Sequence, residues 1–540
     1  LSVRCGLIVR TPVLLRAFSF GLFAGVCGLL GAGPSVIAAE TIRFQFNQFS
    51  REVSIKSLEE FSRSGVVGPE LRPTMKHLKP STQEVFRSAL TQSMPLDPSR
   101  VAKFLDTPIG QSSLQQLVKV LAQPPEIAEP ALSSALILGS AKDGELSFID
   151  VLEAYPTEIL PINVAALLSL GRQLKRQFNF QNALFTQLTP MLGTPSEGPT
   201  LSELAKPGQV SFTQIPFQFQ GKDGRNITAV VYLPSSATPS LPASLVVIAP
   251  GLNTDMNALL YAGKQLASHG YAVASLNFPF TSNTALKAMI KGTGQIPAPN
   301  TWYFQPLSVS ELIDQVQSRW GERVNTNEVG AIGQSLGGYT VMALAGAELD
   351  WKHLVLGCAP MDDPVTVVLN SAVVWQCVAP GKVVKRISFR DPRVKAALAI
   401  NPVTNPIFSA ASLGEMDVPI MMISGTNDIL SPPISQQLIP FTGLGHSDSR
   451  LVIQHKGTHF SFLEGVSDVP GFLIGPDQAL ARTELKGLSK AWFDQHLRAG
   501  LDPFGSAPLL AGDGPLKMLV LPPFTREQLQ QADPGLREFP

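Results

Sequence analysis

The second half of the chain carries, in order, a serine, an aspartate and a histidine that together could perform nucleophilic catalysis. Ser335 stands between Gly333 and Gly337 in the stretch VGAIGQSLGGYT. A serine hydroxyl is a weak nucleophile at neutral pH, so it needs a base to accept its proton and a carboxylate to orient that base. The pattern G-x-S-x-G also arises by chance, and it indicates a nucleophile only where a strand precedes it and a helix follows.

The residues around Ser335 predict that context. EVGAIG is an apolar strand, and the small residues from Leu336 to Ala347 favour a helix. Ser335 would then lie on a sharp strand-to-helix turn, where glycines on both sides let backbone segments approach closely. The alternative is a small residue in an ordinary tight turn, and partners elsewhere in the chain decide between the two.

Candidates for the acid and the base follow two later strands. Asp428 lies just after VPIMMISG, in GTNDILSPP, and His459 lies just after RLVIQHK, in GTHFSF. In a sheet of this kind the acid and then the histidine follow the nucleophile at strand ends, so we predict Asp428 and His459. The competing histidines are His455, inside the last strand, and His446, in the loop before it. The competing carboxylates are Asp362, Asp363 and Asp391.

A tetrahedral oxyanion needs two backbone N–H donors. One comes from the residue after the nucleophile and the other from the loop after an earlier strand. The predicted donors are Leu336 and, in IAPGLNTDM, Leu252. The alternative for PGLN is a turn without a catalytic role.

Three consecutive aromatic residues, Trp302, Tyr303 and Phe304, precede a helix expected from Ser308 to Trp320. Ser308 and Glu311 have the spacing of a capping box at the start of that helix. The aromatic residues would lie on the side of the sheet where loops approach the nucleophile. They could line an acyl pocket, or they could simply pack against one another.

The elements that must position these residues follow from the hydrophobic periodicity. From Val210 the period is two, and VSFTQIPFQFQ and ITAVVYLP predict a hairpin. Apolar strands then alternate with helices as far as Leu497, which predicts a mostly parallel sheet with helices on both faces. An excursion at 348–391 interrupts this alternation, and it could shape a pocket or be a packed decoration.

The first part of the chain differs. Over 40–192 apolar residues recur at three and four spacing with Gly or Pro between the segments, which predicts a small all-helical domain. A stretch rich in Pro, Gly, Ser and Thr at 193–209 predicts a linker. The catalytic domain is then expected at 210–512 and a C-terminal tail at 513–540.

Residues 1–39 have the pattern of a secretory signal peptide. Three arginines precede an apolar run over 17–30, and small residues surround Ala38. A membrane anchor is the alternative, but the run is shorter than the roughly 20 residues that a spanning helix needs. We therefore expect export to the periplasm or the exterior, with no membrane span after cleavage.

Charge and cysteine usage exclude several classes of function. Lys plus Arg and Asp plus Glu each number 42, so nothing predicts attraction to nucleic acid or to an anionic membrane surface. Beyond the signal peptide the cysteines are Cys358 and Cys377, which would form a disulfide in an oxidising compartment or remain two buried thiols. They lack a zinc-type spacing, and no metal or cofactor is predicted.

The segments APGLNTDM, LASHGYAVASLNFP, GQSLGGYT, SGTNDILSPP and GTHFSF, in this order, resemble the α/β-hydrolase superfamily. They are most similar to the branch that joins predicted dienelactone hydrolases, platelet-activating-factor acetylhydrolase and cutinase-type polyester hydrolases. The resemblance covers about 210–497, and the preceding region resembles a domain of uncharacterised function found ahead of such hydrolases in exported bacterial proteins. Dienelactone hydrolases use a cysteine nucleophile, so Ser335 favours ordinary ester hydrolysis.

The resemblance implies an exported serine hydrolase that cleaves carboxylic esters through an acyl-enzyme intermediate. Its partner would be a small-molecule or lipid ester. A lipase or a phospholipid acetylhydrolase-like activity is an alternative with the same residues. An alternative of another class is an envelope binding module whose hydrolase fold is catalytically idle.

Overall fold

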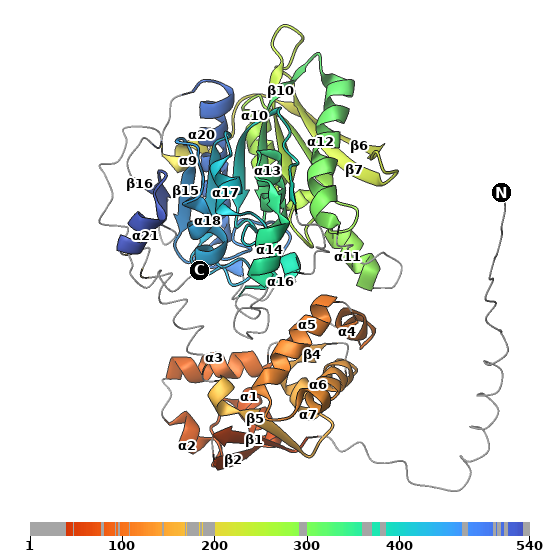
Figure 1. Ribbon diagram of the computed structural model, residues 1–540, viewed down its shortest axis with the longest axis vertical. Helices are drawn as coiled ribbons and strands as arrows, with labels where there is room; N and C mark the ends of the chain where they lie inside the picture. Colours follow the sequence, from red (N-terminus) through yellow and green to blue (C-terminus); the bar gives the residue numbers. More distant parts are fainter. Residues whose placement is uncertain are drawn as a thin grey trace, which may run out of the picture.

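The computed structural model places two bodies along the chain, and Figure 1 shows the N-terminal one beside the strand ends of the larger one. The predicted signal peptide, apart from Ala39, lies outside the described residues. The structure describes residues 39–46, 48–76, 80–91, 93–94, 98–106, 108–142, 145–167, 169, 183, 186, 200–290, 300–358, 370–377, 385–466, 474–500, 504, 509–511 and 517–532.

The N-terminal domain contains a small sheet as well as helices. Its strands, in the order β2-β1-β5, are β1 (Thr41–Phe46), β2 (Phe49–Ser54) and β5 (Ile159–Asn163). β1 pairs with β2 as a hairpin and with β5 in parallel. The prediction of an all-helical domain was therefore wrong, because the β1–β5 pairing joins segments more than a hundred residues apart and leaves no local periodic signal.

Helices complete the core of this domain. Phe61, Ala128 and Leu152, from three different helices, lie in one buried cluster with Ile42 of β1 and Leu160 of β5. The helices are α1 (Ile55–Ser64), α2 (Arg72–Met75), α3 (Pro80–Thr91), α4 (Pro98–Leu105), α5 (Pro108–Leu117), α6 (Pro125–Gly139) and α7 (Phe148–Glu153). A further short pair of strands is β3 (Ser93–Met94) with β4 (Leu146–Ser147).

The second body is built on a ten-stranded sheet in the order β16-β17-β15-β14-β13-β10-β8-β9-β7-β6. The six strands from β15 to β9 are parallel, and antiparallel strands flank them on both sides. The strands are β6 (Phe212–Gln220), β7 (Asn226–Pro234), β8 (Ala243–Ala249), β9 (Ala272–Asn277), β10 (Val324–Gln334), β13 (Val394–Ile400), β14 (Ile420–Gly425), β15 (Arg450–Gln454), β16 (Leu509–Ala511) and β17 (Met518–Leu521). The predicted mostly parallel sheet is confirmed, and it is consistent with an α/β-hydrolase fold.

Helices cover both faces of this sheet, as predicted. α12 (Thr301–Trp320) and α13 (Leu336–Leu344) pack on one face, and α10 (Leu260–Ser268) and α20 (Gln478–Leu497) pack on the other. The central strand β8 shows why its residues are apolar throughout. Leu245 and Val247 pack in the core on the side of α12 and α13, whereas Val246 and Ile248 pack in the core on the side of α10 and α20.

The second body extends at both ends beyond 210–512, the bounds predicted for it. Leu201–Leu204 forms a short helix, α9, inside the predicted linker, and it packs against α20 with Leu201 buried. At the other end β17 pairs with β15, and α21 (Arg526–Ala532) follows it. The prediction of a tail at 513–540 was wrong, because the four apolar residues MLVL complete the sheet edge and are buried there.

The excursion at 348–391 carries its own short elements. They are β11 (Leu349–Asp350), α14 (Trp351–Cys358), α16 (Ser371–Cys377) and β12 (Arg386–Ile387). β11 pairs with β12, and a disulfide between Cys358 and Cys377 joins the ends of α14 and α16.

Within the part of the chain that the structure describes, no helix has both the length and the apolar character that crossing a membrane requires.

Candidate active site

Ser335 occupies the turn between β10 and α13, with φ 56° and ψ −116°. A positive φ is strained for a residue with a side chain, so the surrounding backbone must hold this conformation. A Cβ on Gly333 would lie 2.0 Å from the carbonyl oxygen of Gly337, and a Cβ on Gly337 would lie 2.0 Å from that of Ala249. Both flanking positions therefore require glycine, as the sequence predicted.

Hydrogen bonds from the neighbouring strand hold this turn. The N–H of Ser335 donates to the carbonyl of Ile400, the last residue of β13, at 2.8 Å. The carbonyl of Ser335 accepts from Tyr339 in α13 at 3.0 Å and from Val403 at 3.3 Å. Ser335 is buried, with 9% of its surface still accessible to solvent.

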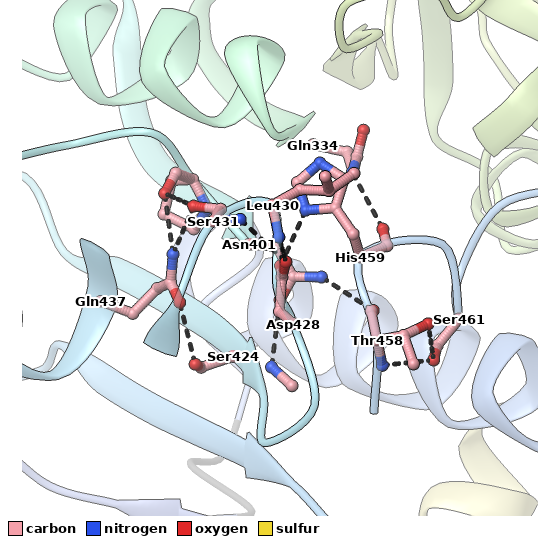
Figure 2. Close-up of polar contacts among 12 residues, drawn as sticks. Gln334, Asn401, Ser424, Asp428, Leu430, Ser431, Gln437, Thr458, His459 and Ser461 are labelled. Carbon is pink, nitrogen blue, oxygen red and sulfur yellow. Dashed lines mark hydrogen bonds and ion pairs between the residues drawn. The ribbon is translucent and has the colours of Figure 1, made fainter. Parts of the chain in front are cut away.

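Asp428 and His459 meet at the ends of two adjacent strands, and Figure 2 shows their contact. Nδ1 of His459 lies 2.7 Å from Oδ2 of Asp428. Oδ1 of Asp428 accepts from the N–H groups of Leu430 and Ser431, each at 2.8 Å. An ionised carboxylate only accepts, so Nδ1 of His459 donates to it and Nε2 of the neutral ring is free to accept a proton.

A hydrogen bond from the residue before Ser335 links the turn of Ser335 to the segment of His459. Gln334, the residue before Ser335, donates from Nε2 to the carbonyl oxygen of His459 at 3.1 Å. Among the described contacts, no hydrogen bond joins Ser335 directly to His459. Such bonds are often long in structures without substrate, and they shorten when the substrate binds.

The loop that carries Leu252 lies against the turn of Ser335. A Cβ on Gly251 would lie 3.2 Å from Cβ of Ser335. The N–H of Asn253, at φ 57°, donates to the carbonyl of Thr281, which fixes the loop after Leu252. In the described structure the N–H groups of Leu252 and Leu336 donate to no protein acceptor, so both can bind an oxyanion.

The competing residues lie in other surroundings. His455 follows β15, its backbone N–H donates to Lys517, and burial lowers the pKa of its ring. His446 accepts through Nδ1 from the N–H of Asp448 in its own loop. Asp391 is paired with Arg393 at the start of β13. Asp362 and Asp363 lie outside the described residues.

The aromatic residues 302–304 belong to a helix. α12 begins at Thr301, seven residues before the predicted start, so the prediction that Ser308 and Glu311 form a capping box was wrong. Pro306 does not end this helix. It lacks the N–H that would reach the carbonyl of Trp302, and that carbonyl accepts from the hydroxyl of Tyr339 at 2.6 Å instead.

Each of the three aromatic side chains packs against other rings. Trp302 is buried with its ring 4.7 Å from that of Tyr339. Tyr303 contacts Trp351 and Phe389, from the excursion. Phe304 contacts Phe280 and the guanidinium of Arg225. Trp302 is thus part of the core, and the acyl pocket at 302–304 stays a prediction.

Two buried amides beside the site had no role in the sequence predictions. They are Gln334, at the end of β10, and Asn401, directly after β13. The available signal was a polar residue at the end of an otherwise apolar strand, in VGAIGQ and in VKAALAIN. The positive φ of Asn401, 43°, is invisible in a sequence.

Within the described residues no cluster of His, Cys, Asp or Glu has the arrangement of a metal site.

Residues 38–163 match the model of a family described as an alpha/beta hydrolase of unknown function (DUF1400). The matched segment forms the N-terminal domain, whereas the ten-stranded sheet begins at Phe212. The match supports the α/β-hydrolase superfamily for this chain but names no branch, activity or substrate. A search of curated proteins gives no match.

Proposed function

We propose that the protein is a serine hydrolase that cleaves carboxylic esters, with Ser335, His459 and Asp428 as its catalytic triad. The observation that carries this proposal is the 2.7 Å contact between His459 and a buried Asp428, at strand ends beside a serine on a strained turn. A buried acid oriented by two backbone N–H groups fits the role of holding a catalytic histidine.

The reaction would proceed in two halves. Oγ of Ser335 attacks the ester carbonyl carbon while Nε2 of His459 accepts the hydroxyl proton, and the N–H groups of Leu252 and Leu336 bind the oxyanion. His459 then gives that proton to the departing alkoxide oxygen, which leaves an acyl group on Ser335. Water, deprotonated by His459, attacks this acyl-enzyme, and collapse of the second tetrahedral intermediate releases the acid and restores the hydroxyl of Ser335.

The branch and substrate class belong to the same proposal. Serine rather than cysteine at the nucleophile position favours ordinary esters over the dienelactone reaction. Lipid esters, cleaved in a lipase-like or phospholipid acetylhydrolase-like reaction, are the second candidate. Their support is the exposure of two large apolar residues, Val355 and Leu356, on α14.

Export is also part of the proposal. The pattern over 1–39 supports secretion, and the disulfide between Cys358 and Cys377 suits an oxidising compartment. N-terminal sequencing of the protein recovered from its native cell fraction tests this point, and a cytoplasmic protein that retains residues 1–39 would contradict it.

Labelling with a fluorophosphonate, which modifies activated serines, tests the chemistry. The expected result is modification at Ser335, located by mass spectrometry, and none in Ser335→Ala. The same substitution should lower kcat on a short-chain ester by several orders of magnitude. A folded chain that is not labelled and does not cleave esters would overturn the proposal and favour the idle binding module.

A further inference from the structure

Two buried amide side chains bind the segment that carries His459 (Figure 2). Nε2 of Gln334 donates to the carbonyl oxygen of His459 at 3.1 Å, and Nδ2 of Asn401 donates to that of Thr458 at 3.1 Å. We infer that Gln334 and Asn401 are positioning residues that fix His459 between the nucleophile and the acid. This inference rests on the proposed function.

Both amides come from the strands that hold the nucleophile. Gln334 directly precedes Ser335 in the chain. Asn401 directly follows Ile400, whose carbonyl accepts from the N–H of Ser335. Any displacement of the nucleophile turn would therefore carry the amides with it, so the segment of His459 is aligned with Ser335 and not only with its own strand.

Asn401 also reaches the strand that leads to the acid. Its Oδ1 accepts from the N–H of Gly425, the last residue of β14, at 3.1 Å. Its own N–H donates to the carbonyl of Ile423 at 2.7 Å. The fully buried side chain of Asn401 thus links the segment of His459 to β14, which leads to Asp428. Its amide nitrogen and its amide oxygen each have a hydrogen-bond partner.

We expect the hydrogen bonds of Gln334 and Asn401 to matter more for the position of His459 than for the stability of the fold. His459 must keep Nδ1 on Asp428 while Nε2 points at Ser335, and a displacement of about 1 Å can cost roughly 100-fold in rate. A loop held only at its ends would sample such displacements. Two hydrogen bonds to consecutive carbonyls, those of Thr458 and His459, restrict them.

Two substitutions remove these bonds. Gln334→Met keeps the length of the side chain and removes the donor. Asn401→Gly removes the amide and suits the positive φ at this position. We expect each to lower kcat about 10- to 100-fold with KM within about twofold. The rate of fluorophosphonate labelling should fall by the same factor, because it also depends on His459.

Gln265→Met is the matched control. Gln265 on α10 is a buried amide whose Nε2 donates to the carbonyls of Leu204 and Lys206, at 3.0 and 2.6 Å. Its loss should lower the melting temperature and leave kcat unchanged. Asn401→Asp is a second variant, which keeps an acceptor for Gly425 but has no donor for Thr458, and its kcat should fall as well.

The outcomes separate the two proposals. If the wild-type chain is neither labelled nor active, the proposed function fails. If the wild type reacts and the variants at 334 and 401 keep the kcat of the Gln265→Met control, the positioning role is overturned. The double variant should lose less than the product of the single losses, because both amides hold one segment.

A second inference rests on different contacts, those between the two bodies. Helix α4 of the N-terminal domain contacts α11 (Asn283–Ile290), and α5 contacts α16. Figure 1 shows α4 and α5 as the part of that domain nearest to the catalytic body. We propose that the N-terminal domain caps the active site and helps to bind the apolar acyl group of the substrate.

Both contacted helices are tied to the active-site loops. On α11, Nδ2 of Asn283 donates to Oδ1 of Asn253, the residue after Leu252, at 3.1 Å. On α16, the N–H of Ala372 donates to the carbonyl of Leu430, at 3.0 Å, in the loop of Asp428. The N-terminal domain therefore contacts one helix that is bonded to the loop of Leu252 and one that is bonded to the loop of Asp428. A domain that caps the active site would have to lie over these two loops.

The chemistry of the surrounding surface points to an apolar group. Phe104 on α4 is 47% exposed, and Leu117 on α5 is also exposed. Val355 and Leu356 are exposed on α14, which packs against α16. Exposed large apolar residues on helices of both bodies, at or next to the contact, fit a long acyl chain better than a charged or small polar group.

Hydrogen exchange on the full chain tests the cap. Ser335 is labelled with a fluorophosphonate that carries either an ethyl or a dodecyl chain, and amide protection is compared. The dodecyl probe should increase protection in α4 and α5, and the ethyl probe should not. Helix α7, which packs against α1, α3 and α6 of its own domain, serves as the internal reference. Equal protection of α4 and α5 by both probes would overturn the cap.

A substitution gives an independent check. Phe104→Ser should lower kcat/KM for a dodecanoyl ester several-fold and leave the acetyl ester unchanged. Phe148→Ser is the control, because Phe148 is equally exposed, at 52%, on α7 of the same domain. Equal effects of both substitutions on both esters would contradict the cap. Absence of all esterase activity would instead refute the underlying function.

Discussion

Nδ1 of His459 lies 2.7 Å from Oδ2 of Asp428, although the two residues are 31 positions apart in the sequence. The adjacent parallel strands β14 and β15 produce this proximity, because each residue follows the carboxyl end of its strand. Both carboxylate oxygens of Asp428 have partners, because Oδ1 accepts from two backbone N–H groups while Oδ2 contacts His459. The relationship thus orients the ring of His459 at a fixed place beside the nucleophile turn.

Asp428→Asn should abolish this orientation while preserving shape. An amide can present its NH2 group to His459 and then favours the wrong tautomer, so kcat on a short-chain ester should fall roughly 10⁴-fold. Steady-state kinetics and circular dichroism of the variant provide the measurement. Asp391→Asn is the control because Asp391 is also buried but is paired with Arg393, and its kcat should stay unchanged. Equal losses in both variants would argue against a role for Asp428 in catalysis.

The nucleophile turn should reject any side chain at Gly337. A Cβ there would lie 2.0 Å from the carbonyl oxygen of Ala249, so the start of α13 would have to move away from the end of β8. Gly337→Ala should therefore cost about 3 kcal/mol or more of unfolding free energy. Urea denaturation measures it. Gly68→Ala, where a Cβ would meet nothing within 4 Å, should change stability by less than about 0.5 kcal/mol. A fully stable Gly337→Ala would show that the turn can relax.

The sheet and the order of the site residues could be predicted from the sequence because each depends on local patterns. The apolar runs that become β8, β10, β13, β14 and β15 are buried on both faces, so they read as continuous hydrophobic segments. Ser335, Asp428 and His459 could then be placed because strand ends meet at one edge of a parallel sheet. Their order along the chain was sufficient for that.

Features that depend on distant partners could not be predicted. β5 exists because Leu160 aligns with Ile42 across the N-terminal domain, and neither segment alone indicates a strand pair. Gln334 and Asn401 can be noticed as polar residues at the ends of apolar strands, but the sequence does not show that they bind the carbonyls of His459 and Thr458. The start of α12 was misplaced because Pro306 is tolerated where the hydroxyl of Tyr339 satisfies the carbonyl that proline leaves free.

The disulfide of the excursion should contribute measurably to stability. Cys358 and Cys377 are 19 residues apart, and a closed loop of this length is worth about 3 kcal/mol through the entropy of the unfolded chain. The double substitution Cys358→Ser/Cys377→Ser should lower the unfolding free energy by about that amount. The reductant dithiothreitol should have the same effect on the wild type and none on the variant. Equal stability of wild type and variant without reductant would mean that the bond is not formed in solution.

Acid should weaken the junction at the start of β13. Burial by itself would raise the pKa of Asp391, but hydrogen bonds from Arg393 and Ser310 together outweigh it and hold that pKa below its usual value. A group whose pKa is lower in the folded state stabilises the protein above its unfolded pKa, here about 4, and loses that contribution as pH falls through the folded pKa. The difference in unfolding free energy between wild type and Asp391→Asn should therefore be constant near neutral pH and shrink below about pH 4.

Arg393 provides the complementary test of this junction. Arg393 also donates to Asp314, on α12, at 2.7 Å, so it links the strand to the helix that covers it. Arg393→Met leaves the carboxyl of Asp391 buried without its cation, and the variant should be destabilised by several kcal/mol at neutral pH. The pKa of Asp391 should then rise, because the side chain of Arg393 no longer offsets the effect of burial, so the variant should gain stability relative to wild type as pH falls. Urea titrations at pH values from about 7 to 3 measure this, and parallel curves for the two proteins would show that the pair does not control the acid response.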